Sequence, residues 1–281
     1  MHKTPNGDHD AEGALTIMLT GATAGTGRAT ASALAGRAGH LVLHGPERED
    51  EVAELLRAVR KELAPGARLD YFAADYANPA EVARLVRRVR AVTDRIDLLV
   101  NNAERPGAPA RTVNAGGTEL TFRTNYLAPV QLTDGLIDLI GDRSRGRIVN
   151  VASGTHLTTA LHPDDPGLAR HPYSASLAHA HAGLALVTYS RRLARHRPRH
   201  AIDVVAMDPA WMSTHPGAGS AAGADRPDRA AADIRHVAAL CDDNGAWYHG
   251  RAPGPINPQA CDHGVQERLH DITEFALRGG L

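Results

Sequence analysis

The chain has 281 residues, a formal net charge of −1, 43% hydrophobic residues and 22% charged residues. These values are those of an ordinary globular protein and indicate neither a nucleic acid nor an anionic membrane as a partner. The length suits one large α/β domain rather than two. Two cysteines are too few for a disulfide framework, and no apolar run could span a bilayer, so we expect a cytoplasmic protein.

Apolar runs alternate with helical patterns after a tail over residues 1–13, which we expect to be disordered. The predicted strands cover 14–21, 40–45, 68–75, 96–103, 146–153, 201–210 and 244–250. The predicted helices cover 27–38, 47–63, a stretch from Pro79, 116–140 and 173–195. This alternation predicts an α/β fold: one doubly wound domain over 14–281, with about seven mostly parallel strands and helices on both faces. A flexible loop is expected at about 215–231.

The turn after the first predicted strand is rich in glycine. It reads TGATAGTGRAT over residues 20–30 and contains Gly21, Gly25 and Gly27. Glycines between a strand and a helix let the backbone approach a pyrophosphate, whose charge the helix N-terminus stabilises. The alternative is that they only allow the strand and the helix to pack closely.

The spacing T-G-x-x-x-G-x-G resembles the short-chain dehydrogenase/reductase family, and further matches follow in the family's order. They are Asp75 in AADYAN, the NNA that begins at Asn101, Asn125 in TNYLAP, Ser153 in RIVNVAS, Tyr173 in YSASL and Thr214 in MDPAWMST. The resemblance spans about 14–255. It implies a single-domain Rossmann-like fold, a small-molecule substrate, an NAD(P)(H) cofactor and a homo-oligomer, either a dimer or a tetramer.

The resemblance also implies roles for these positions. Tyr173 is the expected general acid/base, Ser153 the residue that hydrogen-bonds the substrate oxygen, and Asn125 the holder of a water in a proton relay. The expected cofactor-binding residues are Gly21, Gly25, Gly27, Asp75, Asn101 and Thr214. We predict no metal site.

One departure from the family lies just after the tyrosine. Leu177 stands where the family has a lysine that binds the nicotinamide ribose and lowers the pKa of the tyrosine. A leucine can do neither, and no lysine occurs after residue 61. The nearby histidines are expected to be loop, packing or solvent-facing residues rather than catalysts; they are His156, His179 and His181.

Other departures lie near the expected cofactor. Glu104 replaces a glycine of the family's N-N-A-G turn, where it would either oppose the cofactor phosphates or point to solvent. Pro46 stands where NADP-preferring relatives often have an arginine. Asp208 and Ala210 replace part of an H-P-G segment. Together with Leu177, these changes suggest that NAD(P)(H) binding is weakened or absent.

Three functions are consistent with this pattern. The favoured one is non-redox acid/base chemistry by Tyr173 and Ser153 on a small carbonyl or hydroxyl compound, such as a cyclisation, dehydration or isomerisation in secondary metabolism. The first alternative is an NAD(P)(H)-dependent ketone/alcohol oxidoreductase with an atypical way to activate Tyr173. The second is a non-catalytic relative that serves as a binding protein.

Overall fold

A computed structural model describes residues 15–141, 146–196, 202–209 and 226–279. Within these residues one sheet has the strand order β3-β2-β1-β4-β5-β6-β7-β8, and all neighbours are parallel except β7 and β8. The strands are β1 (Leu15–Leu19), β2 (Ala38–Gly45), β3 (Arg68–Ala73), β4 (Leu98–Asn101), β5 (Gly146–Val151), β6 (Ile202–Asp208), β7 (Trp247–His249) and β8 (Ala252–Pro253). The predicted doubly wound sheet is therefore confirmed, with one short antiparallel strand added.

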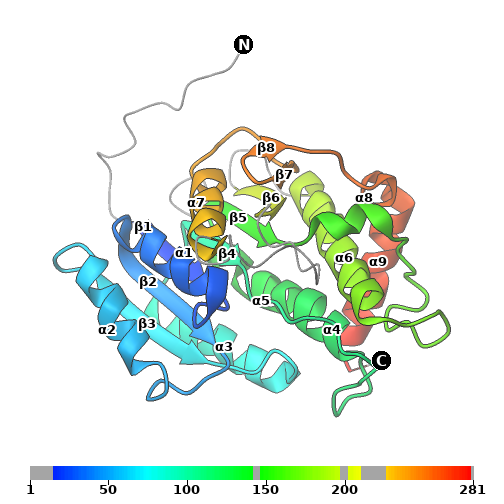
Figure 1. Cartoon of the computed structure of the whole chain (residues 1–281), viewed down its shortest axis with the longest axis horizontal. Coiled ribbons are helices and arrows are strands. Elements are labelled where there is room, and N and C mark those ends of the chain that lie inside the picture. The colour runs from blue at the N-terminus through cyan, green and yellow to red at the C-terminus, as the bar shows by residue number, and fades with distance from the viewer. Residues whose placement is uncertain (1–14, 142–145, 197–201, 210–225, 280–281) are drawn as a thin grey trace.

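Helices cover both faces of the sheet. They are α1 (Gly25–Ala35), α2 (Ala53–Glu62), α3 (Pro79–Val92), α4 (Leu120–Phe122), α5 (Ala128–Leu136), α6 (Ala175–His196), α7 (Arg226–Ala238), α8 (Pro258–Cys261) and α9 (His263–Leu277). Figure 1 shows α1, α2 and α7 on one face and α3, α5 and α6 on the other, with α8 and α9 packed beside α6. A π-helical turn, Arg123–Leu127, joins α4 to α5, and a 3₁₀ turn, Gly154–Thr158, follows β5.

The hydrophobic core has two layers because alternate strand residues point to opposite faces. On β1, Ile17 and Leu19 belong to the layer beneath α1, α2 and α7, whereas Met18 belongs to the layer beneath α3, α5 and α6. All three side chains are fully buried. This packing fixes the sheet, so the loops at the carboxyl ends of the parallel strands are held in place.

Several predicted boundaries are wrong. The flexible loop expected at 215–231 extends too far, because residues 226–231 form the start of α7. That helix has a proline at its second position, buries Ala230, Ala231 and Ile234, and packs mainly on α1 and also on β5. The helix predicted from 47 begins at Ala53, and the one predicted from 116 begins at Leu120, where the Glu119 carboxylate caps it. The tail over 1–13 lies outside the described residues.

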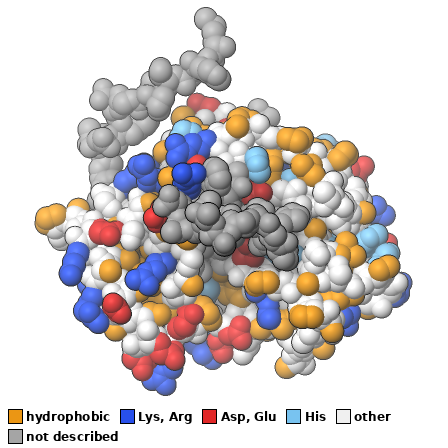
Figure 2. All heavy atoms as spheres, in the orientation of Figure 1, with side chains coloured by type: hydrophobic (Ala, Val, Ile, Leu, Met, Phe, Trp, Pro, Cys, Tyr) orange, Lys and Arg blue, Asp and Glu red, His pale blue; other side chains and the backbone are white. Residues whose placement is uncertain are grey.

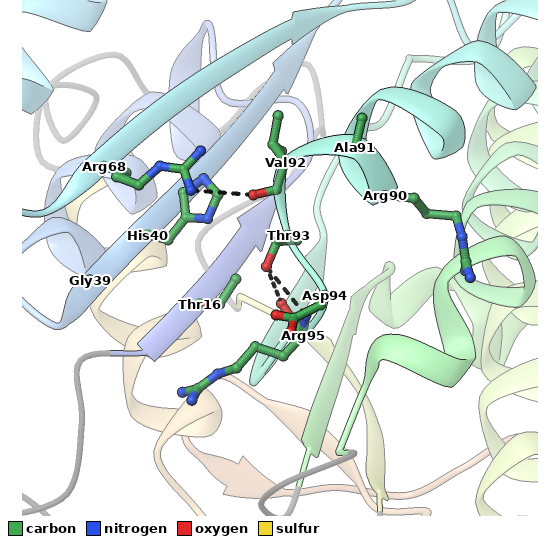
Figure 3. A pocket seen from close by; sticks show the side chains of 10 residues that line it. All are labelled: Thr16, Gly39, His40, Arg68, Arg90, Ala91, Val92, Thr93, Asp94 and Arg95. Carbon is green, nitrogen blue, oxygen red and sulfur yellow. Dashed lines mark hydrogen bonds between the residues drawn. The ribbon is translucent and has the colours of Figure 1, made fainter.

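The amino ends of the strands surround a hollow of about 620 Å³. Figure 3 shows its lining, which includes Arg68, His40 and Arg95. These basic side chains already have acidic partners: Arg68 and His40 contact Asp70, and Arg95 contacts Asp97. The hollow is at the edge of the sheet opposite the glycine turn.

The surface in Figure 2 carries basic and acidic side chains close to one another, as the near-neutral net charge suggests. Both cysteines, Cys241 and Cys261, are free and exposed. No described helix is long and apolar enough to cross a membrane.

Candidate active site

The turn between β1 and α1 is built on close contacts at two glycines. Gly21 has a φ of +65°, and a Cβ there would lie 2.6 Å from the Cα of Ala103. A Cβ at Gly27 would lie 1.8 Å from the carbonyl oxygen of Gly21. The Asn102 amide braces the same turn, since it donates to the carbonyl oxygens of Thr20 and Gly21 at 3.0 and 3.2 Å. Close packing is therefore one function of the glycines.

The third glycine has no such neighbour. A Cβ at Gly25 would meet no atom within 4 Å, so the turn is open at this point. The preceding residue, Ala24, gives α1 no side-chain cap, and the first turn of α1 contains no acidic residue. The first N–H groups of a helix lack partners within the helix, and they bind anions. The open, uncapped end of α1 could therefore bind a pyrophosphate, while Gly21 and Gly27 allow the turn to pack closely.

The strands beside this turn end in acidic residues. Glu47 lies just after β2, and its Oε2 atom is buried with no hydrogen-bond partner. Its backbone is fixed, because the Tyr71 hydroxyl donates to its carbonyl oxygen at 2.7 Å. Asp75 lies just after β3, and its Oδ1 accepts from the N–H of Ala77 at 2.8 Å. Glu47, which the sequence analysis did not select, therefore presents an unsatisfied carboxylate oxygen at the end of β2.

Asn101 and Thr214 were also predicted to bind the cofactor, but only Asn101 lies within the described residues. The Asn101 side chain points into the protein, where it donates to the Thr133 hydroxyl at 3.0 Å and to Asn150 at 2.8 Å. It is 3% exposed, and its neighbour Asn102 contacts the glycine turn instead. Thr214 lies outside the described residues.

Ser153 and Asn125 lie at the carboxyl edge of the sheet. Ser153 lies two residues after the end of β5 at a half-buried position, and its Oγ accepts from the Thr155 hydroxyl at 2.9 Å. Asn125 lies in the π-helical turn and clamps the backbone of Arg105: its Oδ1 accepts from the N–H at 3.0 Å, and its Nδ2 donates to the carbonyl at 2.9 Å. Asn125 therefore fixes the segment that contains Glu104.

Tyr173 has an acidic partner instead of a basic one. It precedes α6, which begins at Ala175 rather than at 173 because the Ser174 hydroxyl caps it by accepting from the N–H of Leu177 at 3.2 Å. The Tyr173 hydroxyl donates to the Glu119 carboxylate at 3.0 Å. Burial, together with this carboxylate, raises the pKa of Tyr173. Such an environment favours the neutral phenol, the opposite of what a neighbouring lysine would do.

One face of α6 borders the loops that follow β4 and β5. A Cβ on Gly107 would lie 2.0 Å from the carbonyl oxygen of Ala175, and a Cβ on Gly183 would lie 3.8 Å from the backbone nitrogen of Ser153. His179 lies one turn from each of these α6 residues, so it shares their face. Leu177 lies about 160° away around the helix from that face. The residue that α6 presents here is therefore His179.

His179 is paired with Glu104. The Nε2 of His179 lies 3.1 Å from Oε1 of Glu104, and the two side chains are 12% and 20% exposed. Burial raises the pKa of Glu104; His179 opposes this rise, and the nearby Asp208 carboxylate adds to it. Asp208 ends β6 and accepts from the N–H of Gly154 at 2.8 Å. Glu104 was expected to lie by the cofactor phosphates or in solvent, but in the structure its partner is a histidine.

The other two histidines are packing residues, which agrees with the expectation for His181, whereas His156 was expected to be a loop residue. His156 is fully buried, with its ring 4.2 Å from that of Trp247. His181 is 1% exposed and accepts from the backbone N–H of His162 at 3.0 Å. His179 was expected to be a solvent-facing or packing residue, and in the structure it is paired with a carboxylate at the edge of the sheet.

Two buried histidines make the fold sensitive to acid. The Nδ1 of His44 accepts from the N–H of Gly21, so its Nε2 carries the proton that is donated to Ala74. Burial lowers the pKa of His44 and of His181 to about 4 each, from 6.5. Because the folded pKa is the lower one, the unfolded chain binds more protons between these values, and stability falls as the pH falls from 6.5 towards 4.

We expect acidification from pH 7.5 to 5.0 to reduce the free energy of unfolding by about 2 kcal/mol per histidine. Urea denaturation at the two pH values measures this difference. The variant His44→Gln, which can keep both hydrogen bonds, should lose about half of the pH dependence. The exposed His263 provides the control, His263→Gln. Equal stability of the unmodified protein at both pH values would show that burial does not hold these histidines neutral.

Comparisons with known proteins agree with this architecture. A family model described as short chain dehydrogenase matches residues 15–223. A Streptomyces sp. (strain C5) protein provisionally named daunorubicin C-13 ketoreductase DnrU is 30% identical, over 98% of this chain and 96% of its own length. Retinol dehydrogenase 13 of Mus musculus is also 30% identical, over 72% of this chain and 60% of its own length. A solved short chain dehydrogenase from Burkholderia cenocepacia J2315, in complex with NADP, aligns over 89% of this chain and 98% of its own, with a TM-score of 0.64 and 22% identity. The resemblance found in the sequence is confirmed, and the chain belongs to the short-chain dehydrogenase/reductase family.

Proposed function

We propose that this protein is an NAD(P)(H)-dependent oxidoreductase that interconverts a small ketone and its alcohol. The open, uncapped end of α1 at Gly25 is the observation that carries the proposal, because it fits a dinucleotide pyrophosphate. The relatives named as a ketoreductase and a retinol dehydrogenase support the same reaction class. They favour this alternative over the non-redox chemistry that the sequence analysis preferred.

The departures that suggested weak cofactor binding have another explanation. Glu104 contacts His179, so its charge has a partner other than a cofactor phosphate. Leu177 lies away from the face of α6 that borders the site, and His179 lies on that face. Neither residue therefore argues against a bound dinucleotide.

Each part of the site has a role under this proposal. The turn from Gly21 to Gly27 and the N-terminus of α1 would hold the pyrophosphate, and Asp75 would lie at the adenine end. When bound, the nicotinamide supplies or accepts the hydride. Ser153 would orient the substrate by donating a hydrogen bond to its oxygen, and Asn125 would keep the loop after β4 in place through its bonds to Arg105.

The direct test is a panel of ketones and aldehydes incubated with NADH or NADPH. Oxidation of the cofactor, together with an alcohol product two mass units heavier than its ketone, is the expected result. A product that forms without cofactor would support the non-redox alternative and exclude this proposal.

We expect NADH to bind more tightly than NADPH because of Glu47. Its unpaired Oε2 can accept a hydrogen bond from a ribose hydroxyl, and its charge repels a 2′-phosphate. The nearest arginine in the chain, Arg48, is already 3.1 Å from Asp50, and Pro46 offers no charge. Calorimetric titration should give at least about a tenfold preference for NADH, which corresponds to roughly 1.4 kcal/mol.

The variant Glu47→Gln should narrow this preference, mainly by improving NADPH binding. Glu49→Gln, an exposed change in the same acidic stretch, should keep the preference of the unmodified protein. Tighter binding of NADPH than of NADH to the unmodified protein would refute the role of Glu47.

A further inference from the structure

We propose that Glu104 and His179 form the proton-transfer pair of this site and donate the proton to the substrate oxygen in place of Tyr173. This assignment rests on the proposed oxidoreductase function. It names two residues that the match with the family does not select, since Glu104 stands where the family has a glycine.

Glu104 and His179 lie at the ligand-binding edge of the sheet. Glu104 follows the carboxyl end of β4, Ser153 follows β5, and Asp208 ends β6, so all three lie at the sheet edge where doubly wound folds bind ligands. On α6, His179 lies one turn from Gly183, which packs against the backbone of Ser153. A carbonyl oxygen that is hydrogen-bonded to Ser153 would therefore lie beside the turn of α6 that carries His179.

The hydroxyl of Tyr173 already has a buried hydrogen-bond partner. The proton of the Tyr173 hydroxyl is directed at Glu119, a carboxylate that is 2% exposed. Glu119 cannot move away easily, because it also accepts the N–H groups of Thr121 and Phe122 at the start of α4. To donate to a substrate, Tyr173 would have to leave this buried partner. His179 and Glu104 are instead each other's partners, so the proton lies within the pair itself.

The charged groups around Glu104 and His179 favour the binding of a proton by the pair. Glu104 is faced by His179 from α6 and by Asp208 from β6, and Asp208 in turn has Nδ1 of His249 at 3.6 Å. Two neighbouring carboxylates favour the retention of a proton, because the negative charge of each opposes the ionisation of the other. The pair is also only 12% and 20% exposed, so few water molecules compete for that proton.

The proposed step transfers a hydride and a proton to the carbonyl group of the substrate. In the reduction, a bound reduced nicotinamide would supply a hydride to the carbonyl carbon, and the electron pair of the C=O π bond would move onto oxygen. That oxygen takes a proton from the His179 imidazolium, which leaves a neutral imidazole beside the Glu104 carboxylate. A proton from solvent then restores the pair. The net reaction consumes one ketone, one reduced nicotinamide and one proton, and yields one alcohol and one oxidised nicotinamide.

The test compares His179→Gln and Glu104→Gln with His196→Gln. The control lies on the same helix and breaks a similar pair, since Nε2 of His196 lies 3.2 Å from Oε1 of Glu267 at the far end of α6. We expect His179→Gln and Glu104→Gln each to lower kcat by about 100-fold or more and to remove the pH dependence of kcat. NADH affinity, measured by calorimetry, should change less than about threefold in all three variants.

A second measurement needs no turnover. Carbon NMR of the Glu104 carboxyl group in the cofactor-free protein should show a higher titration midpoint in His179→Gln than in the unmodified protein, because the cationic partner is lost. An unchanged midpoint would show that the two groups are not coupled, and it would overturn the assignment.

The kinetic outcomes separate the two proposals. If the unmodified protein oxidises NADH with a ketone, and His179→Gln keeps the same kcat and pH profile while Tyr173→Phe loses activity, the tyrosine is the proton donor and only this assignment fails. If the unmodified protein oxidises no NADH with any carbonyl compound, the proposed function fails, and the assignment fails with it.

Discussion

The substitution Gly27→Ala is expected to abolish cofactor binding. The new Cβ would lie 1.8 Å from the carbonyl oxygen of Gly21 and 2.7 Å from Nδ2 of Asn102, so the turn itself must move. A displacement of about 1 Å at a positioning element can reduce function about 100-fold, and overpacking costs about 1–3 kcal/mol of stability. Calorimetric titration with NADH and urea denaturation measure the two effects.

The matched control for this change is Gly36→Ala at the other end of α1. Gly36 has an ordinary helical backbone, with φ −65° and ψ −13°, and a Cβ there would meet no atom within 4 Å. This variant should bind NADH normally and be at least as stable as the unmodified protein. Normal NADH binding by Gly27→Ala would refute the placement of the pyrophosphate at this turn.

The substitution Asp243→Ala should reduce the free energy of unfolding by more than Gly27→Ala does. The Asp243 carboxylate accepts two hydrogen bonds from the Arg147 guanidinium, at 2.8 and 2.9 Å, and the side chains are 13% and 7% exposed. Burial raises the pKa of Asp243, but the hydrogen bonds and charge of Arg147 outweigh this effect, so the pKa is lowered. Removal of one partner leaves a buried cation, which costs about 3–5 kcal/mol. Oδ2 of Asp203 lies 3.9 Å from Nη1 of Arg147 and would still partly balance its charge. The loss in the free energy of unfolding should therefore be near the lower end of this range.

An exposed pair of the same geometry provides the control. Arg90 donates to both oxygens of Asp138, at 2.7 and 2.8 Å, but these side chains are 40% and 61% exposed. Solvent screening makes such pairs weak, so Asp138→Ala should cost far less than Asp243→Ala. Urea denaturation of both variants at pH 7 tests the comparison. Equal losses would mean that burial does not strengthen the Arg147–Asp243 pair.

The sheet could be predicted from the sequence because its signals are local. Each buried strand appears as a short apolar run, and the glycine turn marks the junction of β1 and α1. The start of α7 was missed because Gly- and Ala-rich residues precede it, although Pro227 and Asp228 are typical of a first helical turn.

The candidate site was harder to predict because its contacts join distant residues. Glu104 and His179 are 75 positions apart, and Tyr173 and Glu119 are 54 apart, so no spacing rule links them. Local ambiguity also matters. Asn101 and Asn102 are neighbours, yet only Asn102 contacts the glycine turn, because successive side chains leave an extended segment in opposite directions.

Calorimetric titration with NADH and NADPH measures whether this site binds a reduced nicotinamide dinucleotide. We expect saturable binding of NADH, weaker binding of NADPH, and loss of NADH binding in Gly27→Ala but not in Gly36→Ala. No binding of either dinucleotide at millimolar concentration would contradict the account and would favour non-redox chemistry at this site.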